Sequence, residues 1–117
     1  MPTAEGEIDF HNFADFAHLE YSTNGILTLI WHPTEVGEFR LGGQPLKQAA
    51  LKFTDVLHFS VSPRDSSVPI SEDRTLEEFE VTDLKSDYLC ISFRFLGGVR
   101  VQVKAVLMEL LVDFEKG

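Results

Sequence analysis

The clearest pattern in the sequence is a regular alternation of apolar and polar residues in the last third of the chain. Two stretches carry apolar residues at every second position: Leu89, Ile91, Phe93 and Phe95, then Val101, Val103, Ala105 and Leu107. A period of two is typical of strands that bury one face. We therefore predict that residues 88–113 form two antiparallel strands and that the fold is built around an antiparallel sheet.

The loop between these two strands contains the pair Gly97-Gly98. A two-residue loop would set Phe95 opposite Arg100 and mix apolar with polar side chains on each face. A three-residue loop, residues 97–99, sets Phe95 opposite Val101 and keeps the apolar residues together. We therefore predict the three-residue loop, with one glycine in the left-handed region.

A second hairpin is predicted earlier in the chain, around Asn24-Gly25. This dipeptide favours a two-residue turn in which both residues have positive φ. The flanking strands should run from Leu19 to Ser22 and from Ile26 to Trp31. Pro33 should end the second strand, because proline lacks an N–H donor.

Two further stretches, residues 51–61 and 76–84, also alternate. Asp55 interrupts the apolar face of the first, which predicts a bulge or an edge position near Thr54-Asp55. Weaker patterns predict a frayed N-terminus (1–8), a short helix or irregular turn (9–18), an edge strand or ordered loop (34–44) and one helical turn (45–50). Together these elements predict a single domain, residues 1–117, that is mainly β. Its antiparallel sheet should form a sandwich or be strongly curled, with at most one or two short helices.

The chain carries 10 Lys and Arg against 19 Asp and Glu, a formal net charge of −9. Proteins bind a phosphate backbone through clustered Lys and Arg, so this balance disfavours nucleic acid as a partner. The negative net charge has two interpretations: it keeps the protein soluble, or it attracts a basic partner.

Cys90 is the single cysteine, which excludes an intrachain disulfide and points to a reducing compartment. The first residues lack the basic and apolar regions of a signal peptide. No run approaches the roughly 18 apolar residues of a membrane span. We therefore expect a cytoplasmic protein that does not contact a membrane.

The candidate metal ligands are the four histidines, His11, His18, His32 and His58. The two-residue turn would set His18 opposite Trp31 and His32 opposite Ala17, on different faces, whereas a three-residue loop would bring the two histidines together. A helix over residues 9–18 would align His11, Asp15 and His18, but this spacing matches no known metal motif. We predict no metal and no cofactor.

The sequence assigns no catalytic residue. Cys90 lies in mid-strand, where neither a histidine nor a helix N-terminus is near in sequence to activate its thiol. The sequence contains no nucleophile elbow, phosphate-binding glycine loop or H-E-x-x-H zinc motif. An enzyme is therefore the less favoured class of function.

The densest cluster of charge lies between residues 72 and 80, where five carboxylates accompany one guanidinium. The candidate partner-binding residues are Glu72, Asp73, Glu77, Glu78 and Glu80. One interpretation is that these carboxylates protect an exposed strand from pairing with other chains. The other is a negative ridge that steers a basic partner and fixes its orientation.

The triplet Phe10-His11-Asn12, the apolar hairpin that follows it and residues 51–56 (Leu-Lys-Phe-Thr-Asp-Val) resemble small bacterial immunity proteins of polymorphic toxin systems. The resemblance covers about half of the chain, and Asn12 stands where the pattern has an acidic residue. It implies a non-enzymatic protein that caps a cognate toxin. An acidic surface would suit a toxin that binds nucleic acid.

The sequence thus leaves three functional hypotheses. The favoured one is a protein-binding module, an immunity-type inhibitor or accessory protein that caps a basic partner through an acidic face. The alternatives are a small-molecule-binding β-barrel with a phenylalanine-lined cavity and a metal-dependent enzyme that uses the histidines. The nearly continuous apolar run at residues 107–112 should be buried on both faces, or else meet a partner. The second case would allow a homo-oligomer through the C-terminal strand.

Overall fold

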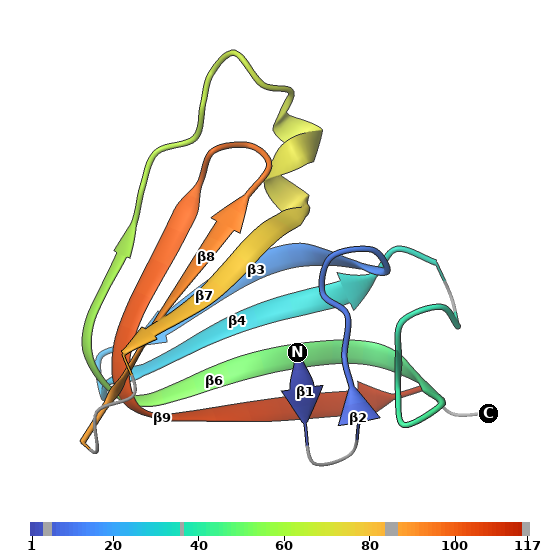
Figure 1. Ribbon diagram of the computed structural model, residues 1–117, viewed down its shortest axis with the longest axis horizontal. Helices are drawn as coiled ribbons and strands as arrows, with labels where there is room; N and C mark the ends of the chain where they lie inside the picture. Colours follow the sequence, from blue (N-terminus) through green and yellow to red (C-terminus); the bar gives the residue numbers. More distant parts are fainter. Residues whose placement is uncertain (4–5, 36, 84–86, 116–117) are drawn as a thin grey trace.

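Seven strands form one antiparallel sheet in the computed structural model, which describes residues 1–3, 6–35, 37–83 and 87–115. The elements are β1 (Pro2–Thr3), β2 (Gly6–Glu7), β3 (Ala14–Ser22), β4 (Ile26–Pro33), β5 (Arg40–Leu41), β6 (Gln44–Val61), the 3-10 helix η1 (Ile70–Arg74), β7 (Leu76–Asp83), β8 (Leu89–Phe95) and β9 (Arg100–Phe114). The strand order is β3-β4-β6-β9-β8-β7, with β5 paired to β6, and the sheet curls into a half-barrel (Figure 1). The predicted mainly β fold with a strongly curled antiparallel sheet is confirmed, and η1 is the only helix in the described ranges.

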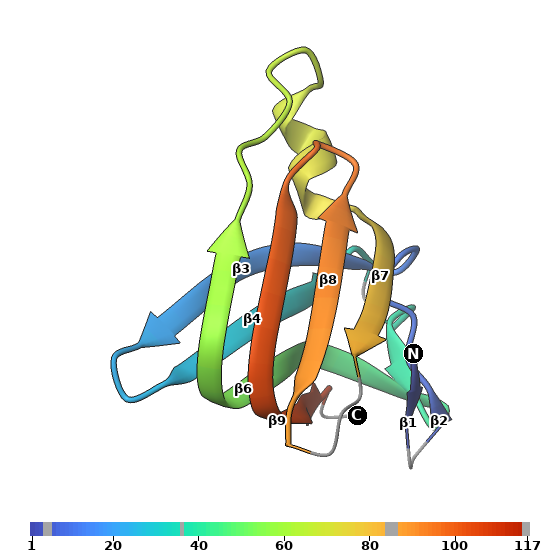
Figure 2. The ribbon, with the colours of Figure 1, turned by 60° about the vertical axis from the view of Figure 1, so that its left-hand side comes forward.

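The curl of the sheet comes from its two longest strands, β6 and β9, of 18 and 15 residues. β4 pairs with the first half of β6, as far as Leu27–Phe53, and β8 pairs with the first half of β9, as far as Leu89–Ala105. The two halves of the sheet therefore diverge from the middle of the β6–β9 pair (Figure 2). There Asp55 has φ 53°, and a register shift follows between Val56 and His58, close to where the sequence predicts a bulge.

The side of the sheet that faces inward holds an aromatic core. Its largest fully buried side chains include Trp31, Phe10, Phe39, Phe53, Phe93 and Phe95. The ring centroids of Phe10 and Trp31 lie 4.5 Å apart, and those of Trp31 and Phe93 lie 6.0 Å apart. These separations are favourable for aromatic pairs, so the rings pack against one another across the half-barrel.

The N-terminal segment packs on this core. β1 pairs with β2, the Ile8 side chain is fully buried, and the Met1 ammonium donates to the Ile8 carbonyl at 2.8 Å. The prediction of a frayed N-terminus is therefore wrong for the described residues of this segment. Residues 4 and 5 lie outside the described ranges.

The first hairpin turns through three residues rather than the predicted two. Ser22 pairs with Ile26, and the Gly25 N–H donates to the Ser22 carbonyl at 3.0 Å. Gly25 has φ 85°, whereas Asn24 does not have a positive φ. The loop is therefore a right-handed turn closed by one left-handed glycine, and the predicted two-residue turn is wrong.

The hairpin between β8 and β9 has the same design. The Gly98 N–H donates to the Phe95 carbonyl at 3.0 Å, the Phe95 N–H donates to the Val99 carbonyl at 2.9 Å, and Gly98 has φ 90°. The loop has three residues and one left-handed glycine, as predicted, but the predicted bounds, 97–99, and the predicted pairing of Phe95 with Val101 are wrong. The loop spans residues 96–98, one residue earlier than predicted, so Phe93 rather than Phe95 lies opposite Val101.

Two segments that could have been helical are not. Residues 45–50 belong to β6, where pairing with β4 and β9 overrides their local helix preference. Near the N-terminus, the Asp9 carboxylate accepts the N–H groups of His11 and Asn12 at 2.8 and 3.2 Å. These bonds form the irregular turn that was one of the two predictions, and β3 begins at Ala14. No helix long and apolar enough to cross a membrane occurs in the described part of the chain.

Candidate functional site

A bulge in the edge strand β7 places two neighbouring glutamates on the same side of the sheet. Leu76 pairs with Phe95 and Glu78 with Arg94, with a register shift between the two pairs. Leu76 is fully buried and Phe79 packs against the core, so Glu77 and Glu78 both lie on the outer face. Without the bulge, strand alternation would have turned one of these two carboxylates towards the core.

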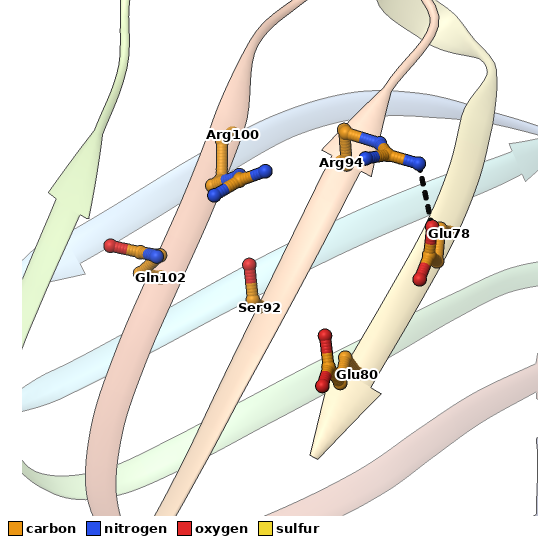
Figure 3. A pocket seen from close by; sticks show the side chains of 6 residues that line it. All are labelled: Glu78, Glu80, Ser92, Arg94, Arg100 and Gln102. Atoms are coloured by element: carbon orange, nitrogen blue, oxygen red, sulfur yellow. Dashed lines mark hydrogen bonds and ion pairs between the residues drawn. The ribbon is translucent and has the colours of Figure 1, made fainter. Parts of the chain in front are cut away.

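Arg94 on β8 holds this pair of glutamates. Its Nη2 atom donates to Oε2 of Glu78 at 2.6 Å, and its Nε atom lies 3.3 Å from Oε2 of Glu77. Figure 3 shows the contact with Glu78. The Arg94 side chain is 43% exposed, so water screens both pairs. Their contribution to stability is small, about 1 kcal/mol or less, and their main effect is to orient the two carboxylates.

Arg94 belongs to a shallow hollow of about 150 Å³ on the outer face of β7, β8 and β9. The lining residues are Glu78 and Glu80 from β7, Ser92 and Arg94 from β8, and Arg100 and Gln102 from β9 (Figure 3). The register aligns them in two rows, Glu78–Arg94–Arg100 and Glu80–Ser92–Gln102. The hollow therefore has an acidic wall on β7 and a basic residue, Arg100, on the β9 side.

Two like charges are direct neighbours in this hollow. Arg94 and Arg100 are cross-strand partners, an arrangement that is unfavourable unless other charges compensate it. Glu77 and Glu78 compensate Arg94, while Arg100 forms no ion pair within the residues that the structure describes. Arg100 can therefore donate hydrogen bonds to an acceptor on a partner.

The structure separates Glu72 and Asp73 from the other predicted site residues. Both lie in η1, where the Arg64 Nε atom donates to Oδ2 of Asp73 at 2.8 Å. Asp73 packs so closely on Gly97 that a Cβ atom there would overlap its carboxylate. The Glu72 carbonyl accepts the Gly97 N–H at 3.2 Å. These contacts anchor η1 on the β8–β9 loop, so the five predicted carboxylates do not form one continuous ridge.

The structure does not gather the histidines into a site. A bulge between Phe16 and His18 sets His32 opposite Asp15 and His18 opposite Ile30, so the predicted partners of both histidines are wrong. His18 contacts a glutamate and His32 a glutamine, each at 3.1 Å. The helical alignment of His11, Asp15 and His18 is lost, because this segment is a turn followed by a strand. In the described ranges, no three His, Cys, Asp or Glu side chains come together as a metal site.

Sequence reasoning found the acidic wall of the hollow but missed Arg94 and Arg100. With the loop at residues 97–99, Arg94 would have faced Gln102, so the two arginines would not have been partners. The useful signal was Gly98. A left-handed glycine at the third position of a three-residue loop makes the loop begin at Leu96, and that register pairs the arginines.

Comparison with known proteins supports the fold. No protein-family model and no curated protein matches the sequence. The chain is similar to a crystal structure of an uncharacterized protein from Neisseria gonorrhoeae, with a TM-score of 0.57 and 18% sequence identity over 89% of this chain and 94% of that chain. At this level of identity the likeness shows a shared fold alone.

Proposed function

We propose that the chain is a non-enzymatic protein-binding module that caps a basic partner with the outer face of β7 and β8. The observation that carries this proposal is the β7 bulge, which sets Glu77 and Glu78 side by side on the exposed face, with Glu80 next to them. Three carboxylates against the two guanidinium groups of Arg94 and Arg100 leave one excess negative charge at this edge of the sheet, in a chain whose net charge is −9. The field of these charges raises the association rate of a basic partner and orients its approach.

The hollow provides a place for a basic side chain of the partner. Glu78 and Glu80 project from alternate positions of one strand, so their carboxylates can flank one guanidinium or ammonium group. Arg94 already restrains Glu78, so binding orders this side chain less than it would a freely rotating carboxylate. Arg100 on the opposite wall can donate to a backbone carbonyl of the partner.

An immunity-type inhibitor is the specific form of this proposal. It rests on the sequence resemblance of Phe10-His11-Asn12 and residues 51–56. A toxin that binds nucleic acid has a basic surface, which an acidic face complements. The alternative of a phenylalanine-lined cavity is less favoured, because Phe53, Phe93 and Phe95 are themselves buried against neighbouring aromatic rings. The described residues include no group of three His, Cys, Asp or Glu side chains that could hold a metal ion, so we assign the histidines no role in this proposal.

The test compares Glu80→Lys with the matched control Glu38→Lys. Both glutamates are exposed, and Glu38 lies in the loop before β5, outside the hollow. Each substitution changes the net charge by the same amount. Glu77 and Glu78 are left intact, because reversing them would also release Arg94.

Partners captured from native lysate would be purified and titrated at about 50 and about 300 mM salt, between which the screening length falls from about 14 to about 6 Å. We expect a basic partner whose affinity falls with salt and falls at least about tenfold in Glu80→Lys, with less than about a twofold change in Glu38→Lys. Equal effects of the two variants would contradict a specific acidic face.

A further inference from the structure

The second half of β9 is an open sheet edge. β8 pairs with β9 only as far as Ala105, and no other described strand pairs with β9 on that side. On the opposite side, every residue from Leu107 to Asp113 pairs with β6 without a register shift. This segment runs along the lower margin of the sheet in Figure 1. It therefore offers a straight, regular row of backbone groups to a further strand.

The other open edges carry features that discourage strand addition. β3 has a register shift between Phe16 and His18, and β7 has shifts near both ends together with its three glutamates. The second half of β6 has a shift between Val56 and His58. Bulges and charges of this kind are how natural proteins protect edges from pairing. The β9 edge has no such shift between Leu107 and Asp113.

Apolar side chains lie on both faces of this open edge. Leu107 and Leu111 are 48% and 45% exposed on the outer face, while Met108, Leu110 and Val112 pack against the core on the inner face. The prediction that residues 107–112 are buried on both faces is therefore wrong. The remaining expectation, that one face meets a partner, agrees with this exposure.

We propose that the partner at this edge is a second copy of the chain, paired antiparallel from β9 to β9. The Glu115 N–H donates to the Pro45 carbonyl on β6 at 3.0 Å. By strand alternation, the N–H and C=O groups of Met108, Leu110 and Val112 then point to the open edge. In a two-fold dimer these groups pair with the same groups of the second copy, and the two sheets become one continuous sheet.

Charge selects the register of this pairing. If Leu110 lies opposite Leu110 of the second copy, Glu109 faces Leu111 and Leu107 faces Asp113, so no two carboxylates are directly opposed. Centring the pair on Glu109 would oppose two glutamates, and centring it on Leu111 would oppose Glu109 and Asp113, which is unfavourable. When Leu110 lies opposite Leu110 of the second copy, Glu109 still lies beside Lys52 of β6 in its own chain. Leu107 and Leu111 of the two copies are then diagonal neighbours on the outer face.

The first experiment is sedimentation of the wild-type chain from about 5 to about 500 µM, across which mass action favours a dimer. We expect twice the monomer mass of 13.2 kDa at the upper end. Leu111→Glu opposes Glu109 of the second copy and should weaken dimerisation at least about tenfold. The control Leu57→Glu makes the same change at a leucine that is 58% exposed outside this edge, and it should leave the dimer intact.

Leu111→Lys separates the proposed register from general surface hydrophobicity. It removes the same apolar side chain but places a cation opposite Glu109 of the second copy, so the dimer should persist. A wild type that stays monomeric throughout, or a Leu111→Lys variant as weak as Leu111→Glu, would overturn the proposal.

A disulfide tests the register directly. Glu109 and Leu111 of the two copies would form a non-hydrogen-bonded pair with Cα atoms about 4.5 Å apart, within the range of a disulfide. The double variant Glu109→Cys, Leu111→Cys should therefore cross-link two chains, with the 109–111 linkage identified by peptide mass mapping. Each single variant would hold equivalent Cα atoms about 8 Å apart, too far to bridge, so efficient cross-linking of a single variant would overturn the register. Because the acidic face lies on β7 and β8, Glu80→Lys should leave this dimer unchanged.

Discussion

The substitution Gly97→Ala should destabilise the folded chain because the added methyl group collides with Asp73. Gly97 is buried but does not have a positive φ, so alanine fits its backbone conformation. The new Cβ atom would overlap the Asp73 carboxylate and would lie 3.1 Å from the Asp73 backbone nitrogen. Asp73 is itself held by Arg64, whose Nη2 atom donates to the Val68 carbonyl at 2.7 Å. The added methyl group must therefore displace a side chain that is already fixed by an ion pair.

The expected loss follows from two contributions. Overpacking of this kind costs about 1–3 kcal/mol. Loss of the partly buried Arg64–Asp73 pair adds up to about 1 kcal/mol. We expect the free energy of unfolding to fall by about 2–3 kcal/mol. In urea, with a slope of about 1.5 kcal/mol per molar, the midpoint should fall by about 1.3–2 M.

Asp73→Ala is the matched partner for this measurement, because it removes the carboxylate that the new methyl group would meet. The double variant should be more stable than the sum of the two single losses implies, by about 1–2 kcal/mol. If Gly97→Ala costs less than about 0.5 kcal/mol, or if the two losses simply add, the steric argument is refuted.

Three further predictions are tested by urea unfolding. Phe93→Ala should cost about 3–5 kcal/mol because the ring is fully buried, and a loss below about 1 kcal/mol would contradict this packing. Asp55→Gly should raise the free energy of unfolding by up to about 1 kcal/mol, since φ 53° suits glycine, and a clear loss would show that the Asp55 side chain stabilises the bend. Burial raises the pKa of Asp9, but hydrogen bonds from His11 and Asn12 outweigh it and hold the pKa below 3.8. The hydrogen bonds to the Asp9 carboxylate stabilise the folded state fully above pH 3.8, the pKa of Asp9 in the unfolded chain. This stabilisation is lost as the pH falls through the lower pKa that Asp9 has in the folded chain. The deficit of Asn12→Ala, which removes the 2.9 Å bond to Asp9, should therefore shrink between about pH 5 and about pH 2, and a deficit independent of pH would contradict the assignment.

The strands with one buried face could be predicted from sequence because their alternation is local. In β8, Ile91, Phe93 and Phe95 are buried while the residues between them are only partly buried, as the period of two predicts. The segment 45–50 could not be predicted in this way. It contains good helix formers, and its strand conformation is imposed by pairing with β9, which comes about 60 to 70 residues later in the chain.

Of the residues that line the candidate site, only the glutamates of β7 could be predicted from the sequence. Adjacent carboxylates at Glu77 and Glu78 are visible in the sequence, but the bulge that brings both to the outer face depends on how β7 pairs with β8. The partnership of Arg94 with Arg100 depends on where a three-residue loop begins, and a shift of one residue changes every cross-strand pair. The apolar run after Ala105 likewise gave no sign that the pairing of β9 with β8 would stop at Ala105.

The long β6–β9 pair also sets the order in which the chain can fold. The hairpins β3–β4, β7–β8 and β8–β9 join neighbouring segments, and such local contacts form early because little loop entropy opposes them. The β6–β9 ladder joins Leu46 to Phe114, so it requires closure of most of the chain. During synthesis, the described strands beside β6 are therefore β4 and the short β5 until β9 has left the ribosome. The apolar residues in the second half of β6 are exposed throughout this interval. The chain is therefore most prone to aggregate before β9 has paired with β6.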